Sequence, residues 1–268
     1  MKVSILDTAN VKVGDIELPS QFNEEVRDEI ILRAVLAIQS HKRQPYAAHD
    51  TAGKRSSAKL SRRRKNYRGS YGIGISRVPR KIMTRRGTRL NWVGAFAPGT
   101  VGGRRAHPPK TSKIWGKKIN EKERRKAIRS AISATMLKEV VTNRGHNVPN
   151  NFPFIIDSKF ESVTKTAEAE EILQKLGFTE ELERSSEKKV RVGKGKARDR
   201  KYKKKKGILV VAVNTDNLMK SLSNIPGIDI VRVKDINAEL LAPGGKAGRL
   251  TLWTKDAIEY MKKEKSFT

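Results

Sequence analysis

Apolar side chains recur at helical spacing in two long stretches, residues 23–40 and 120–143. In each stretch an apolar residue returns every three or four positions, which predicts an amphipathic helix with one buried face. Acidic residues crowd the first two turns of the first stretch, where the helix dipole favours them. The second stretch opens with Asn120 and Glu123 at the spacing of a capping box, and Gly145 suits the end of a helix.

Shorter apolar runs predict strands and further helices. The run at 207–213 is continuous and β-branched, as central strands of parallel sheets are. The other predicted strands are 3–5, 16–18, 154–157, 228–233 and 249–253. The other predicted helices are 166–176, a short acidic helix capped by Thr179, 216–223, a helical turn at 235–241 and a last helix from its cap Thr254 to Met261. Strands that alternate with helices predict an α/β fold with a mostly parallel sheet and flanking helices.

Residues 41–118 follow neither period. Few apolar residues there recur at intervals of 2 or 3.6, so the segment cannot enclose a core of its own. It is too basic and too aromatic for a simple linker. We therefore predict a single α/β body, 1–40 and 119–268, interrupted by a long extended basic loop. This loop, the basic arm (41–118), is expected to become ordered only against a polyanion.

The formal net charge of the 268 residues is +30 at pH 7, and its distribution is uneven. The basic arm has 22 Lys and Arg residues and one acid, Asp50. Residues 188–206 have 12 Lys and Arg residues and one acid. The rest of the chain has 24 basic and 26 acidic residues and is almost neutral. We therefore expect a nearly neutral body that carries a second basic segment, a surface loop at 188–206. Such a balance indicates an acidic partner, either nucleic acid or an anionic membrane surface.

Three properties of the basic arm favour RNA as that partner. Its arginine clusters present planar donors that pair with phosphates and stack on bases. Aromatic side chains between them offer faces for unpaired bases, and glycines permit close backbone approach. No helix suited to the major groove of DNA is predicted, and no amphipathic moment favours a membrane surface. The predicted RNA-contacting residues are Arg43, Tyr46, Lys54, Arg55, Lys59, Arg62, Arg63, Arg64, Tyr67, Arg68, Trp92, Arg104, Arg105, His107, Lys110 and Trp115.

The sequence lacks the signatures of catalysis. Gly72 and Gly74 lack the third glycine and the preceding strand of a dinucleotide fingerprint, and the glycine-rich run 97–105 does not end in Gly-Lys-Ser/Thr. The four histidines have no metal-ligand spacing, and there is no cysteine. The longest apolar run, 208–213, is far shorter than the roughly 20 residues of a membrane span. We expect a soluble intracellular protein that is not an enzyme and has no catalytic residue, metal, cofactor, membrane or small-molecule partner.

Several motifs resemble one known family. The most specific is the block APGTVGGRRAHPPK at 97–110, followed by RVPR at 77–80 and KRQPY at 42–46. The helix at 120–142 and the run LWTKDAI at 252–258 share the likeness. Together they resemble large-subunit ribosomal protein four, a universal family, in its archaeal and eukaryotic branch.

The resemblance implies a structural constituent of the large ribosomal subunit, located in the cytoplasm. It further implies a Rossmann-like body among neighbouring ribosomal proteins and an arm threaded through the large-subunit ribosomal RNA. The arm of this family reaches the peptide exit tunnel beside ribosomal protein twenty-two, which puts the tip near 72–89. The tip residues so implied are Arg77, Arg80, Lys81, Arg85, Arg86 and Arg89.

Two alternatives remain open. An RNA-modifying enzyme would use the α/β body for a cofactor and would need a glycine-rich turn after a strand. A free RNA chaperone would share the basic arm without specific docking of the body. The helix at 120–143 also has a basic face, formed by residues 124–126 and 129. Two interpretations of this face are open, a solvated surface or a second RNA contact.

Overall fold

The chain divides into two compact units. The computed structural model describes residues 1–66, 69–72, 74–86 and 89–267, with side chains throughout except at 82–92. One unit, the body, comprises Met1–Lys42 and Gly116–Thr268, and the other, the basic unit, comprises Arg43–Trp115. None of the described helices is long and apolar enough to cross a membrane.

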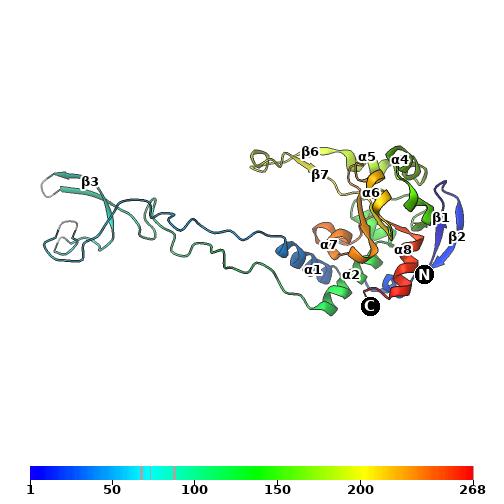
Figure 1. Ribbon diagram of the computed structural model, residues 1–268, viewed down its shortest axis with the longest axis horizontal. Coiled ribbons are helices and arrows are strands. Elements are labelled where there is room, and N and C mark those ends of the chain that lie inside the picture. The colour runs from blue at the N-terminus through cyan, green and yellow to red at the C-terminus, as the bar shows by residue number, and fades with distance from the viewer. Residues whose placement is uncertain (67–68, 73, 87–88, 268) are drawn as a thin grey trace. The chain divides into compact units, whose positions relative to one another are not determined.

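The body is built on a six-stranded sheet in the order β2-β1-β5-β10-β8-β9. Only the pair β1–β2 is antiparallel, and the remaining neighbours are parallel. The mostly parallel sheet predicted from the sequence is therefore confirmed (Figure 1). The strands are β1 (Lys2–Leu6), β2 (Lys12–Glu17), β5 (Phe154–Ile156), β8 (Leu209–Ala212), β9 (Asp229–Arg232) and β10 (Thr251–Thr254).

Alternate side chains of the central strands enter two separate cores. Ile155, Leu209 and Trp253 pack on one face of the sheet, and Phe154 and Val210 pack on the other. This alternation is a consequence of strand geometry, because successive side chains point to opposite faces. Both faces are apolar, so both must be covered by helices.

The described helices supply apolar side chains to both cores. The first core receives them from α1 (Asp28–His41), α2 (Glu121–Ala134), α7 (Ala238–Leu241) and α8 (Lys255–Glu264), and from Val140. The second receives them from α3 (Lys138–Asn143), α4 (Thr166–Lys175), α5 (Thr179–Ser186) and α6 (Asp216–Leu222). Short 3-10 turns complete the body at Ser20–Asn23, Ser158–Ser162, Lys196–Arg198, Val233–Asp235 and Pro243–Gly245. The predicted α/β body with flanking helices is thus the observed one.

Two predicted helices have different limits in the structure. The first begins at Asp28 and not at residue 23, because Arg27 has an extended backbone. The second is interrupted after Ala134. There the hydroxyl of Thr135 donates to the carbonyl of Ile132 (2.7 Å) and accepts from the indole of Trp253 (3.3 Å). At the end of the helix, Thr135 thus supplies the acceptor that the buried indole of Trp253 needs.

The predicted caps are partly correct. Thr254 accepts from the backbone N–H of Ala257 (3.3 Å), as predicted. Asn120 occupies the N-cap position of α2, but its side chain forms no capping hydrogen bond. Thr179 is the first residue of α5 and not its cap, which is Phe178. Gly145 and Gly177 both have positive φ angles after helices, where glycine has no steric penalty.

Both basic segments contain hairpins that apolar periodicity did not reveal. In the basic unit β3 (Arg80–Arg86) pairs with β4 (Arg89–Gly94), and at 188–206 β6 (Lys188–Val190) pairs with β7 (Tyr202–Lys204). The residues of β6 and β7 are exposed, so backbone hydrogen bonding and not apolar burial defines this hairpin. The basic surface segment at 188–206 thus contains a short hairpin.

A buried ionic network links α5 to residues 146 and 147, which follow α3. Glu181, whose side chain is fully buried, accepts from His146 Nδ1 (2.7 Å) and from Arg184 (2.6 Å). It also accepts from the backbone N–H of Asn147 (3.0 Å). Burial opposes ionisation of Glu181, but the hydrogen bonds from Arg184 and His146 hold its pKa below the ordinary value.

Glu181→Gln is expected to destabilise the body by about 3 kcal/mol at pH 7, because it leaves Arg184 and His146 without their buried anion. Since the folded pKa of Glu181 lies below the unfolded one, its carboxylate stabilises the body above about pH 4.5 and this contribution disappears on acidification. The difference between the two proteins should therefore shrink below that pH. Urea unfolding followed by circular dichroism at several pH values measures this.

The exposed neighbour Glu180 provides the control. Glu180→Gln makes the same chemical change beside the network and should alter the free energy of unfolding by less than about 0.5 kcal/mol. Equal effects of the two substitutions would show that the buried network contributes nothing of its own.

Candidate nucleic-acid interface

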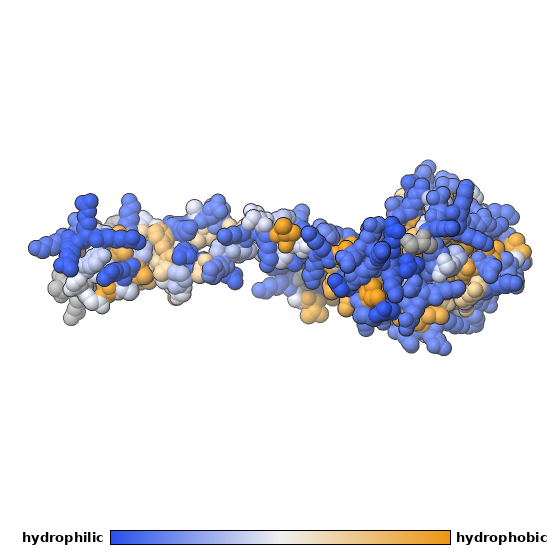
Figure 2. Space-filling model, turned by 90° about the horizontal axis from the view of Figure 1, so that it is seen from below, coloured by the Kyte–Doolittle hydropathy of each residue, from blue (hydrophilic) through white to orange (hydrophobic). Residues whose placement is uncertain are grey.

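The described cations of the basic unit have no carboxylate partners. In the described part of Arg43–Trp115, no Lys or Arg side chain lies within 4.0 Å of a carboxylate. In the body, by contrast, ion pairs are common, such as Arg129–Glu24 (2.8 Å) and Arg232–Asp216 (2.7 Å). Figure 2 shows hydrophilic residues over most of the visible surface. The basic unit therefore presents positive charge that only another molecule can neutralise.

Trp115 is the centre of an aromatic and cationic cluster. Its ring stacks on Tyr46 with 5.0 Å between ring centroids and an angle of 21° between planes. The guanidinium of Arg43 lies 3.9 Å from the centroid of Trp115, and the amine of Lys113 lies 4.4 Å from it. The cluster joins the first and last residues of the unit. Three of these four residues were predicted to contact RNA, and the structure brings them together.

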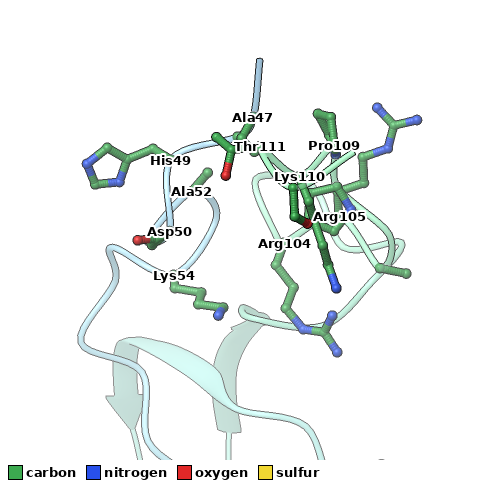
Figure 3. Close-up of a pocket in the computed structure, with 14 residues that line it drawn as sticks. Ala47, His49, Asp50, Ala52, Lys54, Arg104, Arg105, Pro109, Lys110 and Thr111 are labelled. Atoms are coloured by element: carbon green, nitrogen blue, oxygen red, sulfur yellow. The ribbon is translucent and has the colours of Figure 1, made fainter. Parts of the chain in front are cut away.

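A hollow of about 820 Å³ lies between the outgoing and returning segments of the unit. The backbone N–H of Ala48 donates to the carbonyl of Pro109 (3.3 Å) and links the two segments. In Figure 3, Lys54 from the outgoing segment faces Arg104 and Lys110 from the returning one. The predicted residues Lys54, Arg104, Arg105 and Lys110 all line this hollow, together with Asp50. His107 lines a smaller adjoining hollow of about 460 Å³ with Tyr46 and Trp115.

Gly53 permits the close approach of the two segments. Its φ angle is +71°, and a Cβ at this position would lie 2.4 Å from the carbonyl oxygen of Gly103 and 2.5 Å from Cα of Arg104. Both are backbone atoms, so no side-chain rotation could relieve the clash. Only glycine fits here with the segments at their observed separation.

The remaining predicted residues are dispersed. Arg55 donates to the hydroxyl of Thr51 (3.4 Å), and Lys59 forms an isolated β-bridge with Arg80. The side chains of Arg62, Arg63 and Arg64 are exposed. Residues 67 and 68 lie outside the described residues, and so does the side chain of residue 92.

The residues implied for the tip are only partly described. The guanidinium of Arg77 lies 4.6 Å from the ring centroid of Tyr71. Arg80 donates to the carbonyl oxygen (2.6 Å) and the hydroxyl (3.0 Å) of Ser76, and Lys81 is exposed. The side chains of residues 85, 86 and 89 lie outside the described residues, although their backbones belong to β3 and β4.

The comparisons with known proteins decide the family. The sequence matches the family described as "Ribosomal protein L4/L1 family" over residues 16–264. The chain belongs to this family. A relative from Nanoarchaeum equitans, "Large ribosomal subunit protein uL4", is 49% identical over 268 residues, which is all of both chains. Proteins of the same name from Archaeoglobus fulgidus and Methanocaldococcus jannaschii are 44% and 41% identical, each over 97% or more of both chains.

As a member of the L4/L1 family, the chain is a structural protein and not an enzyme. The alternative of an RNA-modifying enzyme is therefore excluded. Among the described residues, no group of three or more His, Asp or Glu side chains is placed to hold a metal ion. His146, one of the four histidines, serves the buried network with Glu181.

Sequence reasoning missed the role of Glu161 at the carboxyl edge of the sheet. Open α/β sheets bind ligands at this edge, where the strand order reverses. The side chain of Glu161 is buried there and accepts from the backbone N–H groups of Val213 (3.1 Å) and Asn214 (2.9 Å) and from the hydroxyl of Thr254 (2.7 Å). In this family member a carboxylate of the chain itself thus occupies donors that would suit a phosphate. The signal available in the sequence was an acid a few residues after the apolar run at 154–156.

The basic face of α2 is largely engaged within the body. Arg125 pairs with Glu121 (2.8 Å), and Arg129 pairs with Glu24 (2.8 Å) and donates to the carbonyl of Phe267 (2.8 Å). Lys126 lies 3.8 Å from Glu24. Of the two readings left open by the sequence, these contacts favour a surface that serves the body's own structure.

Gly53→Ala is expected to weaken binding of a structured RNA at least severalfold, because the added Cβ forces the two segments of the basic unit apart and separates Lys54 from Arg104. Filter binding with a transcript of large-subunit ribosomal RNA measures the affinity.

Gly102→Ala is the matched control. Gly102 also has a φ angle of +71°, but a Cβ there would meet no atom within 4 Å. Gly102→Ala therefore adds the same backbone strain, of the order of 1 kcal/mol, but no clash. If both substitutions weaken binding equally, the strain and not the spacing of the segments is responsible.

Proposed function

We propose that the protein is a structural constituent of the large ribosomal subunit in the cytoplasm and binds large-subunit ribosomal RNA through its basic unit. The observation that carries the proposal is the set of unpaired cations in the described part of Arg43–Trp115, together with the stacked rings of Tyr46 and Trp115. Phosphates neutralise such cations, and unpaired bases stack on such rings. The name shared by the relatives, "Large ribosomal subunit protein uL4", supports the same assignment.

The electrostatic contribution to RNA binding is large but does not suffice by itself. If about half of the 22 cations of the basic arm meet phosphate, log affinity should fall with log salt at a slope of roughly −7 to −10. Ordering a flexible segment opposes binding by about 1–2 kcal/mol per residue. Phosphate contacts therefore have to be supplemented by stacking, which the aromatic side chains of the unit supply.

The proposal also assigns parts to the two units. The body, with helices on both faces of its parallel sheet, is a Rossmann-like domain that docks among neighbouring ribosomal proteins. Residues 41–118 are an extended arm that penetrates the ribosomal RNA, and the body is 1–40 with 119–268. The basic hairpin at 188–206 contacts phosphate separately, since 12 of its residues are cationic and Tyr202 is its sole aromatic residue.

The tip of the arm, near 72–89, is proposed to reach the peptide exit tunnel beside ribosomal protein twenty-two. Its cations would be Arg77, Arg80, Lys81, Arg85, Arg86 and Arg89. The support is the resemblance of 77–80 and 97–110 to the family's arm, together with the antiparallel pairing of β3 and β4, in which Arg86 lies opposite Arg89.

The triple variant Lys54→Gln, Arg104→Gln, Lys110→Gln is expected to incorporate poorly into large subunits, because three cations of one hollow can no longer meet phosphate. In the purified protein the salt slope for RNA binding should become shallower by about 2–3. Sucrose-gradient fractionation of cell lysate, followed by detection of the tagged protein, measures incorporation.

A triple variant of exposed lysines in the body, Lys12→Gln, Lys165→Gln, Lys255→Gln, removes the same charge and should incorporate normally. If the unchanged protein sediments with free RNA or at the top of the gradient and not with large subunits, it is a free RNA chaperone and the proposal is wrong.

Arg85→Glu is expected to leave subunit yield nearly unchanged, because the body and the base of the arm retain their contacts. It should alter the passage of nascent chains through the tunnel, where a negative charge replaces a positive one. Ribosomes that carry the variant can be tested for stalling on a tunnel-sensing peptide. A collapse of subunit yield with normal behaviour of the assembled ribosomes would identify the tip as an assembly anchor.

A further inference from the structure

Asp50 is an exception to the chemistry of the basic arm. It is the one acid among 22 cations, and it lines the same hollow as Lys54, Arg104 and Lys110. No Lys or Arg nitrogen of the described residues lies within 4.0 Å of its carboxylate. An unpaired carboxylate beside a phosphate-binding surface repels the phosphates. Asp50 therefore weakens the attraction between the basic arm and phosphates, so a role for its carboxylate requires an interaction with another group.

The backbone around Asp50 is held in a defined turn. The N–H of Ala52 donates to the carbonyl of His49 (2.8 Å), and the N–H of Lys54 donates to the carbonyl of Thr51 (2.9 Å). The ring Nδ1 of His49 accepts from the N–H of Thr51 (3.2 Å) and lies 2.9 Å from its hydroxyl. Asp50 thus forms part of a preorganised wall, opposite the returning segment (Figure 3). Preorganisation reduces the ordering that a ligand must bring about.

An ionised carboxylate can only accept hydrogen bonds, and it accepts two that run in parallel most strongly. Among the four bases, only guanine presents two adjacent donors, N1–H and the N2 amino group, on one edge. Adenine and cytosine place an acceptor beside their single donor group, and uracil flanks its donor with acceptors. The acceptors would face a negative oxygen and repel it.

We propose that this hollow binds one unpaired guanine nucleotide, with N1–H and N2–H donated to Asp50 and the phosphate held by Lys54, Arg104 and Lys110. The inference rests on the proposed RNA-binding function and adds base selectivity to it. The volume of about 820 Å³ is ample for a nucleotide, since pockets for small ligands measure roughly 300–1,000 Å³. The hollow combines one acceptor, Asp50, with cations from both segments, and these two kinds of group match the two ends of such a nucleotide.

The test uses the full chain and uridine hexanucleotides that carry one guanosine, adenosine or cytidine at the centre, with binding followed by fluorescence anisotropy. The guanosine hexamer should bind about tenfold more tightly than the others. Inosine, which lacks the N2 amino group, should be intermediate, and 7-deazaguanosine should bind like guanosine. The last comparison matters because arginine reads guanine through N7 and O6, and loss of preference with 7-deazaguanosine would overturn the role of Asp50.

Asp50→Asn separates base recognition from charge, because its two expected effects have opposite signs. It should abolish the preference for guanosine and yet tighten binding of the all-uridine hexamer, since a repulsive charge is removed. Glu171→Gln, on an exposed residue of α4, removes the same charge from the body and should preserve the preference. A 6-thioguanosine at the centre should cross-link to residues 47–54 or 104–112.

Several outcomes would overturn the inference. Equal affinities for all hexamers, or a preference for guanosine that survives Asp50→Asn, would show that Asp50 does not recognise the base. A preference lost on addition of EDTA would show that the carboxylate holds a hydrated divalent cation instead. If no hexamer binds while a transcript of large-subunit ribosomal RNA does, the hollow is not a nucleotide site. If neither binds, the proposed function itself fails.

Discussion

Mutual repulsion of positive charges is the constraint on which the architecture depends. The basic arm has one acid for 22 cations, so no folding of the arm on itself can neutralise them. In the body most buried or half-buried cations have carboxylate partners, such as Arg249 with Asp229 (2.6 Å). The basic arm and the body therefore cannot pack into one common core. The body must therefore be complete without the basic unit, and the unit must find its counter-charges in another molecule.

The body satisfies this requirement by drawing its core from both sides of the insertion. Helix α1 precedes the basic unit and α2 follows it, yet both contribute to the same apolar core against Trp253 and Ile155. Polar groups at the margins of the sheet are satisfied by the chain itself. Arg249 donates to the carbonyls of Gly207 (3.0 Å) and Leu240 (2.9 Å), and Glu161 accepts from the ends of β8 and β10. Burial lowers the pKa of Arg249, while Asp229 opposes that effect.

The sequence was most informative where structure follows from local pattern. Short apolar runs located the strands of the body, and charge counting located the basic segments. The interruption between α2 and α3 was not predictable, because apolar residues continue at helical spacing across it. The kinds of residue at the candidate site were predicted, but their grouping was not. Asp50, Lys54, Arg104 and Lys110 line one hollow because Gly53 lets two distant segments touch, and neither periodicity nor composition encodes that contact.

The two points at which the chain leaves and rejoins the body lie next to each other. The N–H of Lys117 donates to the hydroxyl of Ser40 (2.8 Å), and Gly116 lies so close to His41 that a Cβ there would be 2.8 Å from the imidazole ring. Closing a loop grows more unfavourable only slowly with length, by about 0.6 kcal/mol for each doubling. The inserted segment between these points can thus gain or lose residues during evolution with little effect on the stability of the body. The junction thus makes the inserted segment a module whose length the body does not dictate.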